Sequence, residues 1–139
     1  MKALFTFVLL LLTWPAIWSA EDDLPLTTRD VTLKLKDKNL QRFFPEEAQR
    51  HKISGVATIL CTVDQDGRLT DCSIACEAPT GHWFGEATLR MAPYLKLEST
   101  TNDGSPTAGR RFIFPMFYNV AGKRVSEDQQ AKCARWPPD

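Results

Sequence analysis

The chain has 139 residues, with 17 Lys and Arg against 17 Asp and Glu, so it carries no formal net charge at neutral pH. A chain of this length suits one domain with a modest core. The balanced charge, together with the lack of long charge runs, repeats or low-complexity segments, gives no support to a nucleic acid or another polyanion as partner.

Residues 1–20 predict a secretory signal peptide. Lys2 supplies a positive charge, an apolar run follows over residues 4–12, and small residues precede an acidic triplet. The apolar run is shorter than the roughly 20 residues that a membrane-spanning helix needs. We therefore expect export to the periplasm with cleavage near Ala20. The alternative is an uncleaved membrane anchor, because Trp18 stands where a cleavage site prefers a small residue.

Residues 21–43 are interpreted as an N-terminal extension with a short strand. In this extension Val31, Leu33 and Leu35 alternate with polar residues, and a period of two is typical of a strand with one solvent-exposed face. The next segment, residues 44–51, predicts a short helix. A proline suits its first turn, and its acidic and basic residues lie near the ends that the helix dipole favours.

Residues 56–63 and 68–76 predict two strands, which Asp66-Gly67 joins as a hairpin signal. If Asp66 and Gly67 are the centre of a two-residue turn, Cys61 faces Cys72. A slip of one residue would turn the apolar side chains to the other face, so the pattern favours this register. The register predicts an inward-facing set: Ala57, Ile59, Cys61, Val63, Cys72 and Ile74.

Residues 84–91 show apolar residues at helical spacing, and Pro93 ends the predicted helix. Residues 94–97 are expected to be extended. Residues 111–118 predict a final strand that is an edge strand or a bulged one, because Pro115 cannot donate to a ladder. Phe112, Phe114, Met116 and Tyr118 would share one face of it. The fold class is therefore α+β, a small antiparallel sheet with two helices on one face.

Four cysteines in an exported chain indicate disulfides, and sequence alone allows three pairings. The hairpin register selects Cys61–Cys72. That choice leaves Cys76 for Cys133, which would staple residues 119–139, predicted as a polar tail, to the domain. A redox enzyme is disfavoured, because three residues separate Cys72 from Cys76 and no helix N-terminus follows Cys72.

The sequence favours a binding or structural domain over an enzyme. Asp64–Gly67 resembles the start of a calcium loop, but the glutamate required later is missing, so a hairpin turn is preferred. His51 and His82 are isolated from each other, and no paired ligand spacing predicts zinc. No nucleophile with a base partner can be assembled. We therefore predict no metal, no cofactor and no catalytic residues.

Over residues 44–118 the chain resembles the TonB C-terminal domain family. The resemblance rests on an aromatic-proline helix start, a glycine that opens the first long strand, an aspartate-glycine hairpin, an alanine-bearing helix, a polar loop with a glycine, and a last strand with proline and aromatics. The residues assigned to the motif as structural are Phe44, Pro45, Gly55, Asp66 and Gly67.

The resemblance implies a non-enzymatic protein-binding module in the periplasm. Members of this family bind a short segment of an outer-membrane receptor by adding it as a strand to the sheet edge, which also implies a link to outer-membrane transport. The edge residues carried over are Arg111, Ile113 and Phe117. The alternative is a structural or scaffold envelope protein that uses the domain to form a homodimer.

Overall fold

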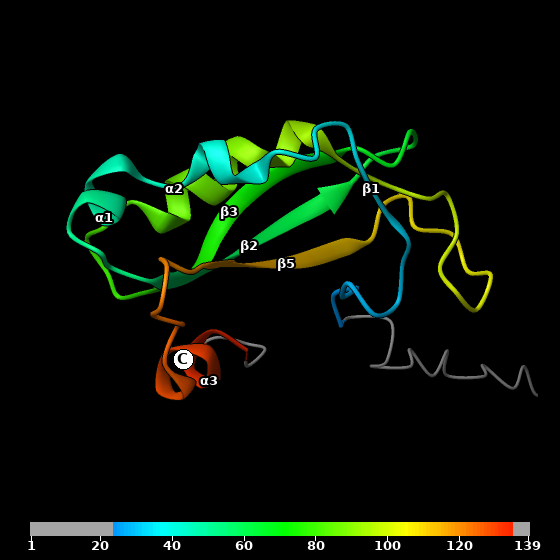
Figure 1. The fold of residues 1–139 in the computed structure, drawn as a ribbon. Helices are drawn as coiled ribbons and strands as arrows, with labels where there is room; N and C mark the ends of the chain where they lie inside the picture. Colours follow the sequence, from blue (N-terminus) through cyan, green and yellow to red (C-terminus); the bar gives the residue numbers. More distant parts are fainter. Residues whose placement is uncertain (1–23, 135–139) are drawn as a thin grey trace, which may run out of the picture.

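The computed structural model describes residues 24–134, so the predicted signal peptide and cleavage site lie outside the described residues. No helix within residues 24–134 is long and apolar enough to cross a membrane. Two single-turn 3-10 helices, Leu40–Phe43 and Ala92–Tyr94, precede α1 and β4. The elements (Figure 1) are β1 (Leu33–Leu35), α1 (Glu46–Arg50), β2 (Gly55–Val63), β3 (Leu69–Ala78), α2 (Phe84–Met91), β4 (Leu95–Leu97), β5 (Arg111–Tyr118) and α3 (Glu127–Ala134).

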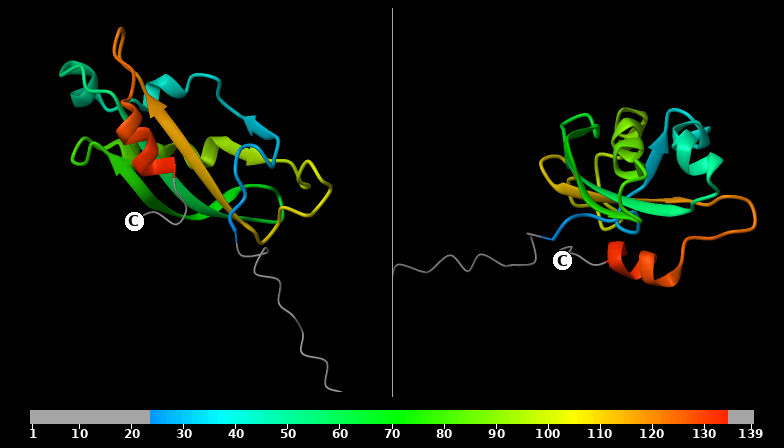
Figure 2. Two further views of the ribbon diagram at one scale, coloured as in Figure 1. Left: turned by 90° about the horizontal axis from the view of Figure 1, so that it is seen from below. Right: turned by 90° about the vertical axis from the view of Figure 1, so that its left-hand side faces the viewer.

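The main sheet is antiparallel, with the strand order β3-β2-β5. On one face lie α1, α2 and a second small sheet made of β1 and β4, while α3 lies on the opposite face (Figure 2). The α+β class and the two helices on one face are thus as predicted. The helix on the other face was not predicted. Because both faces are covered, most residues of the central strand β2 are buried.

Within the segment predicted as a polar tail, residues 127–134 form α3, a helix that the sequence analysis did not predict. The helix begins with a capping box: Gln129 donates its backbone N–H to Ser126 Oγ at 3.3 Å, and Ser126 donates its N–H to Gln129 Oε1 at 3.2 Å. Such a pair satisfies two backbone donors at the start of a helix. The disulfide Cys76–Cys133, which was predicted, then holds the helix against the sheet.

The hairpin between β2 and β3 has a three-residue loop, so the predicted two-residue turn is wrong. Asp64 donates its N–H to the Arg68 carbonyl at 2.9 Å, and Gly67 donates to the Asp64 carbonyl at 3.1 Å. Gly67 has φ +77°, the left-handed conformation that glycine supplies at the end of such a loop. As a result Val63 faces Leu69, one residue away from the predicted register.

A β-bulge restores the predicted register at Leu60 and Ile59, and a second shift between Ile59 and Thr58 then offsets the two strands again. Leu60 faces Ser73 and Thr62 faces Thr70, so Cys61 lies opposite two residues, Asp71 and Cys72. Asp71 takes up the extra residue with φ +49°. Cys61 and Cys72 therefore meet and form the predicted disulfide, with their Cα atoms 4.1 Å apart.

Five of the six residues predicted to face inward are buried or packed against the core, and Ile74 is the exception, with 40% of its surface exposed. Its side chain lies close to Gly85, because a Cβ on Gly85 would come within 2.7 Å of Ile74 Cδ1. Ile74 thus points to the face that α2 covers. It is exposed because β3 is an edge strand and glycine offers no side chain to cover it.

The centre of the core is an aromatic cluster of Phe44, Phe84 and Tyr118, with ring centroids 5.1 to 6.2 Å apart. Gly55 opens β2 beside it, and a Cβ there would lie 2.2 Å from the Phe84 ring. The Tyr118 hydroxyl lies 2.8 Å from Thr88 Oγ1, which in turn donates to the Phe84 carbonyl. The cluster therefore fixes α2 to β5 by packing and by hydrogen bonds.

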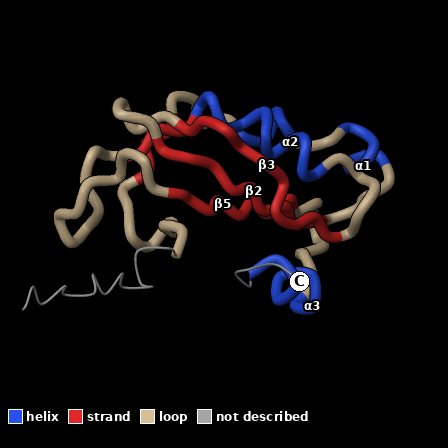
Figure 3. Tube along the Cα trace, turned by 180° about the vertical axis from the view of Figure 1, so that it is seen from behind, coloured by secondary structure: helices blue, strands red, loops and turns tan. Residues whose placement is uncertain are grey.

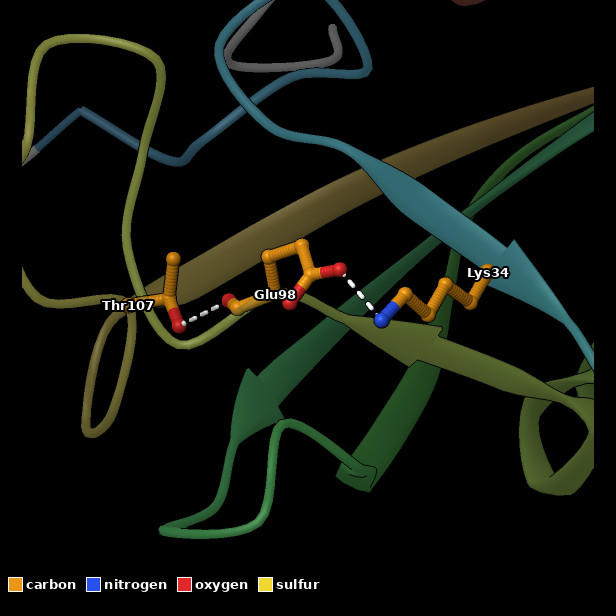
Figure 4. A network of polar contacts seen from close by, with 3 residues as sticks. All are labelled: Lys34, Glu98 and Thr107. Carbon is orange, nitrogen blue, oxygen red and sulfur yellow. Dashed lines mark hydrogen bonds and ion pairs between the residues drawn. The ribbon is translucent and has the colours of Figure 1, made fainter.

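The small sheet of β1 and β4 connects the N-terminal extension to the loop that precedes β5. Lys34 of β1 forms an ion pair with Glu98, and Thr107 donates its hydroxyl to the Glu98 carbonyl at 2.8 Å (Figure 4). These contacts fix the chain path just before β5 begins.

Candidate functional site

β5 is an edge strand of the main sheet, as predicted, and it is not bulged. Its pairing with β2 is regular from Gly55↔Tyr118 to Thr62↔Arg111. Arg110 immediately precedes β5, and its carbonyl accepts the Val63 N–H at 2.9 Å, so the carbonyl faces β2. Because backbone direction alternates along a strand, the residues whose N–H and C=O groups face away from β2 are Arg111, Ile113, Pro115 and Phe117.

Pro115 falls at one of these outward positions. Its missing N–H therefore costs no hydrogen bond to β2, which explains how a proline stands inside a regular strand. The same placement removes one donor from the exposed edge. Natural sheets use proline in this way to limit unwanted strand pairing.

The start of the β5 edge is already paired within the chain. Leu26 forms a parallel bridge to Phe112: it donates its N–H to the Arg111 carbonyl, and its carbonyl accepts the Ile113 N–H, both at 2.8 Å. Leu26 is only 3% exposed. Of the three predicted edge residues, two therefore have a backbone partner already, and sequence reasoning missed this segment.

The open part of the edge lies at its C-terminal end, around Phe117. No residue within 24–134 accepts the outward N–H of Phe117. Its side chain is 42% exposed. Figure 3, which views the molecule from behind, shows β5 along the border of the sheet with α3 close to the end of the strand.

A groove of about 390 Å³ lies beside this open edge. It is bounded by the outer face of β2 and β5, by the end of α3, and by the segment that follows Leu26. Two of the predicted edge residues line it, and Arg111 does not. Its lining residues are Thr27, Thr28, Arg29, Val56, Thr58, Ile113, Pro115, Phe117, Gln130, Cys133 and Ala134.

The wall formed by α3 is held at one point in particular. The disulfide to Cys76 fixes Cys133, with Cα atoms 5.4 Å apart, and Thr58 donates its hydroxyl to the Cys133 carbonyl at 3.2 Å. Around this point Val56, Val125 and Cys133 form a second small cluster of buried side chains. The groove wall is therefore attached to the central strand of the sheet.

A second hollow, of about 500 Å³, lies on the other side of the N-terminal segment and is more polar. Hydrogen bonds from the Thr27 hydroxyl and N–H lower the pKa of Asp30, and a hydrogen bond from Thr101 lowers the pKa of Asp103. Both shifts come from contacts within local turns. These carboxylates are thus used to hold the turns, and within residues 24–134 no three metal-ligating side chains converge.

The residues assigned to the structural motif lie away from the groove. Phe44 and Gly55 belong to the aromatic core, and Pro45 stands immediately before α1. Asp66 and Gly67 form the hairpin loop, where the Gly67 carbonyl accepts the Leu97 N–H at 2.8 Å. They position the sheet and do not line the groove.

The structure is a small α+β domain whose main sheet ends in the edge strands β3 and β5, and an exposed sheet edge is a place where a protein segment can bind. Residues 41–120 match the family described as the C-terminal domain of the Gram-negative bacterial TonB protein. This match covers more than half of the chain, so the chain belongs to that family, as the sequence motifs predicted. The family is a non-enzymatic protein-interaction domain that faces the periplasm, and the two disulfides fit an oxidising compartment.

The solution NMR structure of the Pseudomonas aeruginosa TonB C-terminal domain is similar in fold. The two chains are 21% identical, the match covers 68% of this chain and 91% of that chain, and the TM-score is 0.51. No curated protein matches the chain. Because the family match ends at residue 120, α3 lies outside it.

Proposed function

We propose that this domain binds an extended segment of a protein partner in the periplasm by strand addition to the open part of β5. The observation that carries the proposal is the outward N–H of Phe117, which no residue of the described range 24–134 accepts, at a sheet edge beside an open groove. In strand addition, main-chain hydrogen bonds provide affinity and side-chain pockets provide selectivity. Membership of the family supports a segment of an outer-membrane receptor as the partner, and hence a link to outer-membrane transport.

The open edge offers more acceptors than donors. The carbonyls of Ile113, Pro115 and Phe117 all face outward, whereas the outward N–H of Phe117 has no acceptor among the described residues 24–134. The Ile113 N–H is used by Leu26, and proline has none. A bound segment must therefore donate its own N–H groups along the edge, and it can receive a hydrogen bond only at Phe117.

The test is a titration of the oxidised, ¹⁵N-labelled protein with synthetic peptides that scan the periplasm-facing plug segments of outer-membrane receptors. Binding by strand addition is expected to shift the Phe117 amide resonance and to slow its hydrogen exchange. Phe117→Pro removes this N–H donor, and a lost hydrogen bond of about 1 kcal/mol weakens binding about fivefold. Phe117→Leu keeps the N–H and is the matched control.

Shifts that map to β3, or no shift with any receptor peptide, would contradict the proposal. The alternative, a scaffold protein that dimerises through the domain, makes a different prediction. In that case sedimentation would show a dimer at low concentration, and the receptor peptides would leave the dimer unchanged.

A further inference from the structure

α3 depends on a single residue for its place on the sheet. Of its eight residues, only Cys133 is buried. That residue carries the disulfide to Cys76 and accepts the hydroxyl of Thr58 through its carbonyl. Because burial of apolar surface is the main force that docks a helix, a helix with one buried side chain is held chiefly by that bond. The third side of the groove therefore rests mainly on Cys76–Cys133, with the buried Val125 packed beside it just before the helix.

The register of a bound strand determines which of its side chains reach this groove. Residues directly opposite each other in neighbouring strands place their side chains on the same face of the sheet. The side chains of Pro115 and Phe117 line the groove, so the peptide residues opposite them point toward it too. The residue between those two points to the other face, because side chains alternate along a strand.

The groove is chemically suited to apolar side chains of moderate size. Val56, Ile113, Phe117 and Ala134 give it apolar walls, while Gln130 and the segment of Thr27, Thr28 and Arg29 add polar groups to the lining. The Thr58 hydroxyl is already used by Cys133. A volume of about 390 Å³ lies within the range of ordinary ligand pockets.

We propose that α3 determines the selectivity of the strand-addition site, because it forms the wall of the groove that receives two apolar side chains of the bound peptide. These side chains stand at positions i and i+2 of the peptide. The wall is in place only while the disulfide Cys76–Cys133 is formed. The inference rests on the proposed function and adds to it the pattern of the partner. The occupant is the peptide strand on β5, since Pro115 and Phe117 belong both to the edge and to the groove.

The experiment selects binders from a phage-displayed library of random eight-residue peptides against the oxidised protein. Selected peptides are expected to carry apolar residues at two positions separated by one residue, and to shift the Phe117 amide. Ala134→Trp fills the groove from the exposed end of α3 and is expected to weaken the best selected peptide by tenfold or more. Ala131→Trp changes an exposed residue of the same helix outside the groove, and it should leave the affinity unchanged.

The two disulfides supply a second comparison. The double variant Cys76→Ser/Cys133→Ser should lose the preference for apolar residues at i and i+2, whereas Cys61→Ser/Cys72→Ser, which removes the bond near the hairpin, should keep it. Mass mapping of the remaining disulfide and circular dichroism check that each variant is folded. The comparison with Ala134→Trp leaves both disulfides in place, so it tests the groove independently of the cysteine variants.

If selected peptides shift the Phe117 amide but bind Ala134→Trp as tightly as the native protein, the wall proposal is overturned and strand addition stands. If no selected peptide shifts that amide, both the proposed function and this inference fail.

Discussion

The backbone N–H of Ile113 lies 2.8 Å from the carbonyl of Leu26, so the N-terminal segment occupies part of the sheet edge that a partner would otherwise use. Leu26 is buried, and it also donates to Arg111 across the same edge. The length of β5 that is open to a partner is thereby set from within the chain.

Leu26→Pro tests this pairing. Proline removes the N–H that the Arg111 carbonyl accepts, and its ring disturbs the bridge to Phe112. We expect amide hydrogen exchange at Ile113 to become at least tenfold faster, measured by NMR, while exchange at Phe117 stays the same. Equal protection of Ile113 in the variant and the native protein would contradict the pairing.

Gly55→Ala tests the close approach of β2 to the aromatic core. The added Cβ would lie 2.2 Å from the Phe84 ring, which Phe44 and Tyr118 confine. Overpacking of this kind costs about 1–3 kcal/mol of unfolding free energy, measured by denaturant titration. Phe84→Leu in the same chain should make room, so the double variant should lose less than the sum of the two single losses.

A matched pair of substitutions tests the two faces of β5. Phe114 is 6% exposed and points into the core, whereas Phe117 is 42% exposed on the opposite face. Phe114→Asp places a carboxylate among apolar side chains and should destabilise the fold by several kcal/mol. Phe117→Asp should change the unfolding free energy by about 1 kcal/mol or less. Similar melting temperatures for the two variants would show that the faces are assigned wrongly.

The alkaline limit of stability tests the burial of Tyr118. Burial raises the pKa of its hydroxyl to about 12, against an ordinary value of 10. The folded state therefore holds this proton more tightly than the unfolded state, so the stability contribution is complete below about pH 10 and is lost as the pH rises toward about 12. The loss amounts to about 3 kcal/mol at most.

The comparison is made with Tyr118→Phe, which leaves the hydrogen bond from Thr88 to the Phe84 carbonyl in place. The informative quantity is the difference in unfolding free energy between the two proteins, because every contribution that they share cancels in it. That difference should shrink between about pH 10 and 12. A constant difference across this range would contradict a buried tyrosine.

Elements with a strong local pattern were predicted with their bounds. Alternation over residues 111–118 and helical spacing over 84–91 correspond to β5 and α2, because each of these segments buries one face against a single core. The hairpin loop was misjudged because Asp66-Gly67 is compatible with two loop lengths. In both cases the glycine takes a positive φ, and the pairing of Asp64 with Arg68 shows that the fold uses the longer loop.

α3 was missed for the opposite reason. Its capping box from Ser126 to Gln129 was present in the sequence, but with only Cys133 buried the segment has almost no apolar periodicity to detect. The edge residues of β5 came from the family resemblance together with the strand pattern. The groove could not be predicted from the sequence, because its lining comes from residues 27–29, 113–117 and 130–134, and no local pattern links these segments.

The spacing of the cysteines along the chain has a consequence for biosynthesis. Cys61, Cys72 and Cys76 lie within 16 positions, whereas Cys133 follows 57 positions after its partner. When the chain emerges N-terminus first, the hairpin thiols can be oxidised before the last cysteine is available. Until then Cys76 is a free thiol close in sequence to Cys61 and Cys72, and it could form a non-native disulfide with either of them. Closure of Cys61–Cys72 before Cys133 emerges would leave Cys76 with Cys133 as its one remaining thiol partner, and would so prevent a wrong crosslink.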